Sequence, residues 1–243
     1  IRFNGYELYS HDVAKYRAKA LTNAIAIIPG TLYRDIDRTV TNTEINELRN
    51  FKYPTIQYKV DPDDSSQTGL ISNIYLTPRK KYTFGFDLDA YTSTIQQFGV
   101  GFSTSFLMRN LFKGAENLEI SARGSVGSSK DNAISDSKFF NSSDVGVDAR
   151  LRIPRLLFPV NTQKIIPKYM APTTTISTGI NSQQNIGLDR QNFNSTFSYR
   201  WRPSNTRTNL LEVLNLQYVR NLNAANYFNV YKNSYDKLNY ISS

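Results

Sequence analysis

The run Tyr82-Thr83-Phe84-Gly85-Phe86-Asp87-Leu88-Asp89-Ala90 decides the fold class of this chain. Apolar side chains occupy every second position, and the positions between them are small or acidic. A period of two is typical of a β-strand that has one apolar face and one polar face. The sequence therefore predicts a two-faced strand here. Its length matches the roughly 9 to 11 residues with which a tilted strand crosses a bilayer.

The same alternation returns six times toward the end of the chain. The six runs cover residues 98–108, 118–126, 145–153, 174–180, 193–201 and 211–218. In the last run, Leu211 and Val213 break the parity of the apolar residues that follow, as a β-bulge would. Seven strands in series predict an antiparallel sheet over residues 81–243. Known bacterial single-chain barrels use even strand numbers from 8 upward, so we expect further strands after Ser243.

The polar face of these runs carries many charges. They are Asp87, Asp89, Glu119, Arg123, Asp148, Arg150, Arg152, Arg200 and Arg202. Charges are costly in the dry core between two packed sheets, so this face meets water. The opposite face then meets lipid in a membrane barrel with a wet lumen, or the core of a soluble sandwich or meander. Aromatic residues near the run ends suit the interfacial girdles of a barrel: Tyr82, Tyr91, Phe98, Tyr199, Trp201 and Tyr218.

Residues 1–80 have a different pattern. A short strand is expected near Phe3 to Tyr9, and apolar residues at helical spacing predict a helix over 15–28, which Pro29-Gly30 ends. A second helix is expected over about 33–48, with capping residues at Thr41-Asn42-Thr43 if it restarts there. Strands follow at 55–60 and 70–76. This order predicts a small α+β domain, with three strands covered by two helices.

Composition narrows the chemistry of the chain. It has 243 residues and no Cys, which excludes disulfide scaffolds, thiolate catalysis and cysteine-based zinc sites. A single histidine, His11, excludes a multi-histidine metal site, and no Gly-x-Ser-x-Gly motif supports a hydrolase. We therefore expect no catalytic residue, no cofactor and no metal, and we expect that the protein is not an enzyme.

Charge and hydropathy exclude two further classes. The net charge of +9 and the pI near 9.6 invite a nucleic-acid role, but the Lys and Arg residues are thinly spread. Most aromatics lie on the face opposite the charges, whereas stacking on bases needs both on one face. Mean hydropathy is −0.46 and no apolar run approaches about 18 residues, which argues against a helical membrane protein.

Four stretches carry a likeness to a known family. Residues 29–33 and 41–51 resemble the helical part and exit of a POTRA (polypeptide-transport-associated) domain. A string within residues 109–118 resembles the tight turn between the second and third barrel strands, through Arg109, Asn110, Phe112, Gly114 and Glu116. Tyr199-Arg200-Trp201 is similar to a strand end of TamA-like proteins. On these residues the chain resembles the bacterial surface antigen superfamily of BamA/TamA-like outer-membrane assembly proteins, in the TamA-like branch of Bacteroidetes-type bacteria.

The chain also departs from the family pattern. It lacks the preceding POTRA repeats and the later loop with an Arg-Gly-Phe/Tyr motif. The segment Pro154 to Pro172 is longer than an ordinary periplasmic turn, which leaves the strand register after Pro154 open.

The resemblance implies a POTRA-like domain at residues 1–80 in the periplasm, followed by the first strands of a Gram-negative outer-membrane β-barrel at 81–243. It implies a non-enzymatic factor that inserts or exports client proteins by strand pairing. The partners would be unfolded outer-membrane or surface-exported clients, the lipid bilayer with lipopolysaccharide, and accessory assembly subunits, with no nucleic acid. The alternatives are a passive pore or adhesin barrel, or the barrel module of a larger surface enzyme.

The resemblance also implies two client-pairing edges. The lateral-gate strand would contain Tyr82, Phe84, Gly85, Phe86 and Leu88. The edge for client strand addition would contain Tyr53, Ile56, Tyr58 and Val60. Gly85, with Gly99 and Gly101 on the facing strand, either weakens the gate or relieves crowding in a curved sheet. Pro54, Lys52 and Lys59 also suit ordinary protection of an exposed edge.

Overall fold

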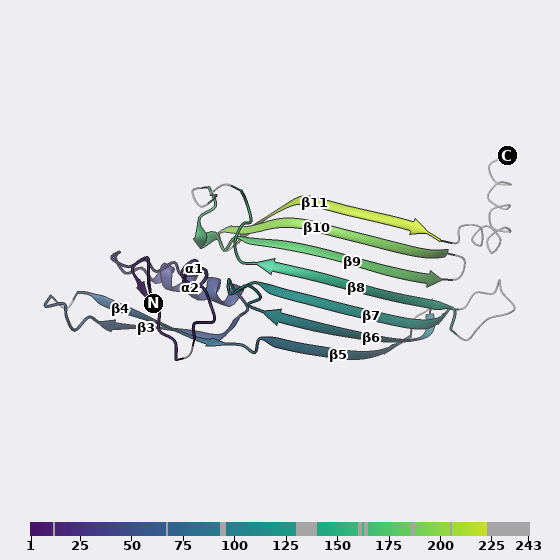
Figure 1. Cartoon of the computed structure of the whole chain (residues 1–243), viewed down its shortest axis with the longest axis horizontal. Helices are drawn as coiled ribbons and strands as arrows, with labels where there is room; N and C mark the ends of the chain where they lie inside the picture. The colour runs from purple at the N-terminus through teal and green to yellow at the C-terminus, as the bar shows by residue number, and fades with distance from the viewer. Residues whose placement is uncertain are drawn as a thin grey trace.

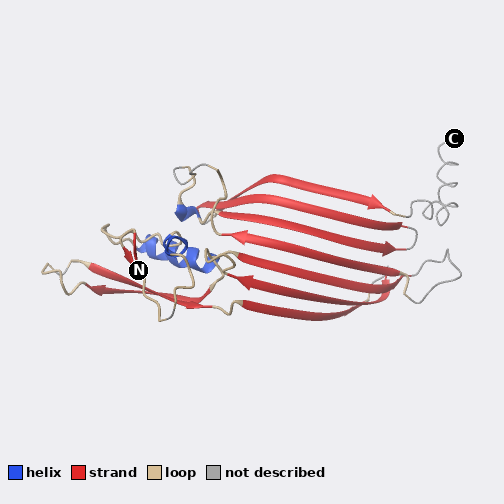
Figure 2. Ribbon diagram, in the orientation of Figure 1, coloured by secondary structure: helices blue, strands red, loops and turns tan. Residues whose placement is uncertain are grey.

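The computed structural model describes residues 1–11, 13–66, 68–92, 96–129, 140–159, 162, 165–185, 188–204 and 206–222. These residues form a long antiparallel sheet with a small helical unit at one end (Figures 1 and 2). In this part of the chain, no helix has the length and apolar character needed to span a membrane. Most of the expected connection Ser128–Ser143 lies outside the described residues.

The large sheet has seven strands that pair in the order of the sequence. They are β5 (Tyr82–Tyr91), β6 (Gln96–Arg109), β7 (Asn117–Ser129), β8 (Ser142–Ile153), β9 (Thr173–Asn185), β10 (Leu188–Ser204) and β11 (Arg207–Asn221). The predicted series of seven antiparallel strands is therefore confirmed. In the described part of the chain β5 and β11 do not pair with each other, so the sheet is open rather than closed into a barrel.

The strand register stays in phase along the sheet. Ile153 pairs with Thr174, so the long connection between β8 and β9 does not shift the pattern that precedes it. Between β10 and β11, Phe197 pairs with Leu214, and the next residue of β10, Ser198, pairs with Glu212. Val213 is left without a partner in this ladder, which confirms the predicted bulge.

The register separates two faces across all seven strands. Directly paired residues point to the same side, and one such row runs through Leu88, Phe102, Gly124 and Val145. We call this side the apolar face. Its large side chains are open: Phe84 is 69 % exposed, and Phe106 is half-buried. Further exposed members are Phe86, Leu88, Val100, Phe102, Ile120, Val126, Val145, Val147, Ile176, Ile180, Leu214, Leu216 and Tyr218.

The opposite side, the polar face, carries hydrogen bonds between neighbouring strands. Arg123 forms an ion pair with Asp148 at 2.5 Å, and Asn192 donates to Asn181 at 2.8 Å. The expected girdle residue Tyr91 pairs with Gly99 and has the parity of this polar face. Its ring lies over Gly99, where a Cβ would come within 2.4 Å of it. The expectation that Tyr91 shares a face with Tyr82 is therefore wrong.

The helical unit differs from the expected three-stranded domain. Its elements are β1 (Arg2–Phe3), β2 (Tyr6–Glu7), α1 (Ala18–Thr22), α2 (Asp35–Glu47), β3 (Phe51–Val60) and β4 (Leu70–Pro78). The first residues form a separate small hairpin, while β3 and β4 form a two-stranded sheet of their own. The order of elements resembles the expectation, but a POTRA-like sheet is not confirmed.

Both helices differ in detail from the predictions. The first is only five residues long, because the chain turns at Asn23 well before Pro29. The second is continuous, and Thr41 does not cap a new helix. Its buried hydroxyl instead accepts the backbone N–H of Ala26 at 2.9 Å and that of Ile27 at 3.3 Å. Thr41 thus fixes the chain after α1 against α2.

The core of the helical unit includes a residue from a turn between two strands of the large sheet. Ala24, Ile45, Leu48 and Phe51 pack together, and Ala115 from the turn between β6 and β7 is buried among them. Burying apolar surface in a shared cluster favours one fixed arrangement of the two parts. The unit is therefore anchored to the end of the sheet through this turn (Figure 1).

Candidate functional site

The turn between β6 and β7 joins the helical unit to the sheet. We call the contacts between the helical unit and this end of the sheet the joint. Asn110, Lys113 and Ala115 all have positive φ angles, between 57° and 64°, so the turn is tightly coiled. The side chain of Asn110 donates to the carbonyl of Lys15 at 2.8 Å and accepts the N–H of Ala115 at 3.1 Å. One amide group thereby closes the turn and holds the strand-to-helix connection that precedes α1.

Glu116 lies at the centre of this turn and is fully buried. Its carboxylate accepts the N–H of Gly114 at 2.8 Å and that of Phe112 at 3.2 Å, and it forms an ion pair with Arg155 at 3.0 Å. Burial raises the pKa of Glu116, but these backbone and arginine donors outweigh it and hold the pKa below its ordinary value. A Cβ at position 114 would come within 2.2 Å of the carboxylate, so only glycine fits there.

Arg109 extends the same joint along the first strand of the sheet. Its guanidinium donates to the carbonyls of Arg49 at 3.2 Å and Lys80 at 3.0 Å, and to the hydroxyl of Thr83 at 2.7 Å. The residues of the family-like turn motif are thus brought together, except Phe112, whose side chain is exposed. Their observed role is to hold the joint.

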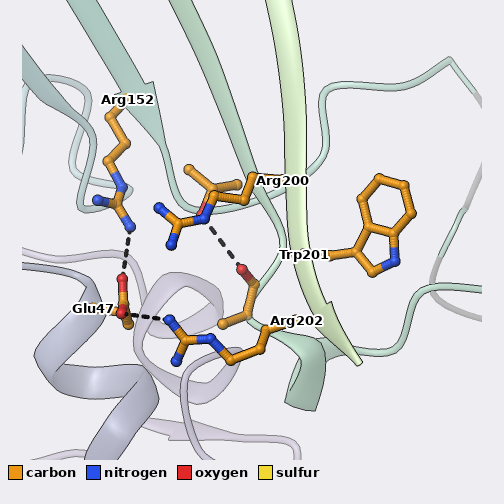
Figure 3. Close-up of a pocket in the computed structure, with 7 residues that line it drawn as sticks. Glu47, Arg152, Arg200, Trp201 and Arg202 are labelled. Atoms are coloured by element: carbon orange, nitrogen blue, oxygen red, sulfur yellow. Dashed lines mark hydrogen bonds and ion pairs between the residues drawn. The ribbon is translucent and has the colours of Figure 1, made fainter. Parts of the chain in front are cut away.

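A second contact of the joint is electrostatic. Glu47, the last residue of α2, accepts hydrogen bonds from Arg152 of β8 at 3.0 Å and from Arg202 of β10 at 2.9 Å (Figure 3). These residues line a small cavity with Arg200 and Trp201, and Figure 3 shows Trp201 pointing away from the arginines. Burial raises the pKa of Glu47, but the two arginines outweigh it and lower the pKa overall.

Replacing Glu47 with Gln should weaken the docking of α2 on the sheet. Both guanidinium groups are largely buried and would lose their counter-charge, so we expect a loss of about 1–3 kcal/mol in the free energy of unfolding. Denaturant titration measures it. The control is Glu7→Gln, which removes the exposed ion pair with Arg2 and should leave stability unchanged. Equal effects of the two variants would contradict a special role of Glu47.

Glu44, one helical turn before Glu47, is buried without a full set of partners. Its side chain is 4 % exposed, and Oε1 has no hydrogen-bond partner. Burial raises the pKa of Glu44 to about 8, partly opposed by the charge of Lys168 in the connection between β8 and β9. Lys168 donates to the carbonyl of Thr22 at 3.4 Å, so this connection also reaches the helical unit.

The raised pKa of Glu44 makes the stability of the joint fall as pH rises from about 4.5 to about 8. Because folded Glu44 binds its proton more tightly than the unfolded chain does, its contribution is complete below about pH 4.5 and is lost as pH rises toward 8. Glu44→Gln mimics the protonated form, so we expect it to exceed the parent in stability by about 2–4 kcal/mol at pH 9 and to equal it at pH 4.

Thermal unfolding across this pH range measures the difference. Asp35→Asn, at the exposed start of the same helix, controls for the loss of one carboxylate. A constant difference between Glu44→Gln and the parent at every pH would contradict the assignment.

The expected gate strand is β5, an edge strand of the seven-stranded sheet. In the described part of the chain it pairs with β6 alone, which leaves the backbone groups of its other edge open. Tyr82, Phe84, Phe86 and Leu88 are each at least 51 % exposed on the apolar face. The structure thus brings the predicted residues together on a free edge.

Two of the three glycines near this edge, Gly85 and Gly99, relieve crowding. Gly85 pairs with Ser105, while Gly99 and Gly101 pair with Tyr91 and Asp89, so the three do not face one another. A Cβ on Gly85 would lie 2.7 Å from the hydroxyl of Ser105. At Gly85 and Gly99 the facing side chains need the space that glycine leaves, which favours the crowding interpretation there, whereas a Cβ on Gly101 would make only ordinary contacts at 3.6 Å.

The second predicted edge is β3, whose partner in the described residues is β4. Ile56 is buried, Tyr58 packs edge-on against Tyr33 with ring centroids 4.9 Å apart, and Val60 is 54 % exposed. Tyr53 lies in an irregular part of the strand, with φ of 45° and 90 % exposure. The four residues share a strand, but Tyr53 stands apart from the regular edge.

Sequence reasoning missed the ion pairs that fasten α2 to the sheet. Arg152 follows Glu47 in the sequence by 105 residues, and Arg202 follows it by 155 residues. Only the tertiary structure brings the three side chains together. Arg152 and Arg202 were expected simply to face water. The available signal was an acidic residue at the end of a helix, together with arginines clustered at the ends of β8 and β10.

No protein-family model matches this chain, and no curated protein matches its sequence. The joint, the two open edges and the two-faced sheet are therefore the observations from which its function has to be argued.

Proposed function

We propose that the seven strands are part of an outer-membrane β-barrel, with the helical unit on the periplasmic side. The observation that carries this proposal is the apolar face. Large side chains such as Phe84 and Leu88, 69 % and 70 % exposed, cover one side of the sheet, and the other side carries charges and amides. An apolar surface of this extent needs a partner, and lipid fits a face whose reverse is wet.

The positions of the connections support this orientation. The tight turn between β6 and β7 lies at the same end as the helical unit (Figure 1). In barrels of this class, the short turns lie in the periplasm, so this turn supports the orientation, whereas the connection between β8 and β9 at the same end is longer than such a turn. The helical unit then sits beneath the sheet, fastened by Ala115, Glu116 and Glu47.

The proposed activity is assembly or translocation of client proteins by strand pairing on β5. A client strand that enters lipid must satisfy its backbone N–H and C=O groups, and an open strand edge offers partners for them. β5 has such an edge, ten residues long, next to the lipid-facing side chains. This mechanism requires no catalytic group.

Site-specific photo-crosslinking tests the proposal. A benzophenone side chain at Phe86 of β5 is compared with one at Val147 of β8. Both positions are on the apolar face, at 56 % and 45 % exposure, but only β5 is an edge. In cells, position 86 should form adducts with unfolded outer-membrane clients and position 147 only with lipid. Lipid adducts alone at both positions would favour a passive barrel, and an absence of lipid adducts would refute the membrane location.

A further inference from the structure

The connection between β8 and β9 begins with a segment that folds back over the sheet. We call Pro154–Pro159 the strap. The ring of Phe158 packs edge-on against that of Tyr199, with centroids 6.2 Å apart. Tyr199 belongs to the apolar face, because it pairs with Thr174 in the row that continues from Ile153. The strap therefore lies on the apolar face, at the end nearest the helical unit.

Burial confirms that the strap covers this corner of the face. Ile153, Thr174 and Tyr199 are 5 %, 0 % and 7 % exposed. Apart from Gly124, they are the only buried residues among the described positions of the apolar face. Elsewhere this face is open, so the strap occupies a place that lipid would otherwise take under the proposed function.

Four backbone groups of the strap, the N–H and C=O of Arg155 and of Leu157, are paired within the protein. Thr174 donates its hydroxyl to the carbonyl of Arg155 at 2.6 Å and accepts the N–H of Leu157 at 2.9 Å. Tyr199 donates to the carbonyl of Leu157 at 2.5 Å, and the N–H of Arg155 bonds to the carbonyl of Ile153 at 2.8 Å. The two prolines at its ends have no N–H to satisfy.

This pairing satisfies the backbone of Arg155 and Leu157, as irregular backbone near hydrocarbon requires. Unpaired N–H and C=O groups are costly there, and non-helical segments are tolerated only where protein groups satisfy them.

Three side chains of the strap are exposed, although the ring of Phe158 also packs against Tyr199. Leu157 is 39 % exposed, Phe158 is 52 % exposed, and Pro159 is also exposed. If the strap only protected Tyr199 from water, its own apolar groups would be turned inward. Its one charged residue, Arg155, is instead held by Glu116 of the joint. The strap thus presents three consecutive apolar groups beside a cation, as interfacial anchors do.

We propose that the strap is an interfacial membrane anchor, with Leu157 and Phe158 inserted at the boundary between headgroups and acyl chains of the leaflet on the side of the helical unit. This inference rests on the proposed function, because it takes the apolar face as the lipid face. It adds a lipid-binding site outside the strands. Through Arg155 and Glu116, the anchor also fixes the height of the joint relative to the bilayer.

The absence of Cys allows a direct test with single-cysteine variants in the intact protein. A bimane label is placed at Phe158, at Phe86 and at Tyr53, which is 90 % exposed in the helical unit. The proteins are reconstituted in vesicles of phosphatidylethanolamine and phosphatidylglycerol. Some of these lipids are brominated, either near the glycerol end or near the middle of the chains. Iodide in the buffer reports exposure to water.

We expect label 158 to lose about half its emission with bromine near the glycerol end, and less with bromine at mid-chain or with iodide. Label 86 should respond most to mid-chain bromine, and label 53 to iodide alone. A Leu157 label provides a second position should the first fold poorly. If iodide alone quenches label 158 while brominated lipid still quenches label 86, the strap is not a membrane anchor, but the proposed function still stands. Quenching of 86 and 158 by iodide only would overturn both.

Discussion

The Glu116→Ala variant should lose about 3–5 kcal/mol of unfolding free energy, because it leaves a buried turn without its central acceptor. The N–H groups of Phe112 and Gly114 and the guanidinium of Arg155 would lose their partner together. The site is fully buried, so water cannot easily replace the carboxylate. Denaturant titration of the intact protein, with protease cleavage in the turn as a second readout, measures the loss.

The matched control is Glu119→Ala, three residues further along the chain. Glu119 is exposed on the polar face of β7, so its removal leaves no buried donor and should change stability little. If both variants lose the same free energy, Glu116 has no special role in the turn. A second check is acid titration. Because the pKa of folded Glu116 is lowered, its contribution is present above about pH 4.5 and disappears as pH falls through the folded value.

The strands were predictable from the sequence because their signal is local and repeated. The alternating run from Tyr82 to Ala90 and the six later alternating runs located all seven strands. The change of parity among the apolar residues of the last run located the bulge at Val213. Period two follows from strand geometry and needs no tertiary information. The open apolar face follows from the same pattern, although what covers it does not.

The joint was not predictable in the same way. The turn motif was recognisable, but the burial of Ala115 among residues of α1, α2 and β3 depends on contacts between distant segments. The face of Tyr91 was also predicted wrongly. Ala90 lies on the apolar face, and Tyr91 follows it directly in the strand, so Tyr91 points to the polar face. The first strand was expected to be one of three strands covered by two helices, but its residues pair within a small separate hairpin.

The second large effect concerns the apolar face itself. In a bilayer, Phe102→Lys should cost about 2–4 kcal/mol, because Phe102 lies midway along the central part of β6, where a cation on the lipid face is most costly. Ser103→Lys, one residue later, points to the polar face, where Asp87 provides a nearby carboxylate. We expect this variant to differ little from the parent.

This pair of variants separates the membrane interpretation from a soluble one. If the apolar face met water, replacing the 49 % exposed Phe102 with Lys would remove exposed apolar surface and raise solubility without the cost. Phe102 also covers Gly124, where a Cβ would come within 2.6 Å of its ring, so Phe102→Leu controls for the lost cover. Unfolding and refolding in lipid vesicles measures all three variants. If Phe102→Lys leaves the free energy of unfolding in vesicles unchanged, lipid is not the partner of this face. The proposed strand-templating role of β5 would then be wrong as well.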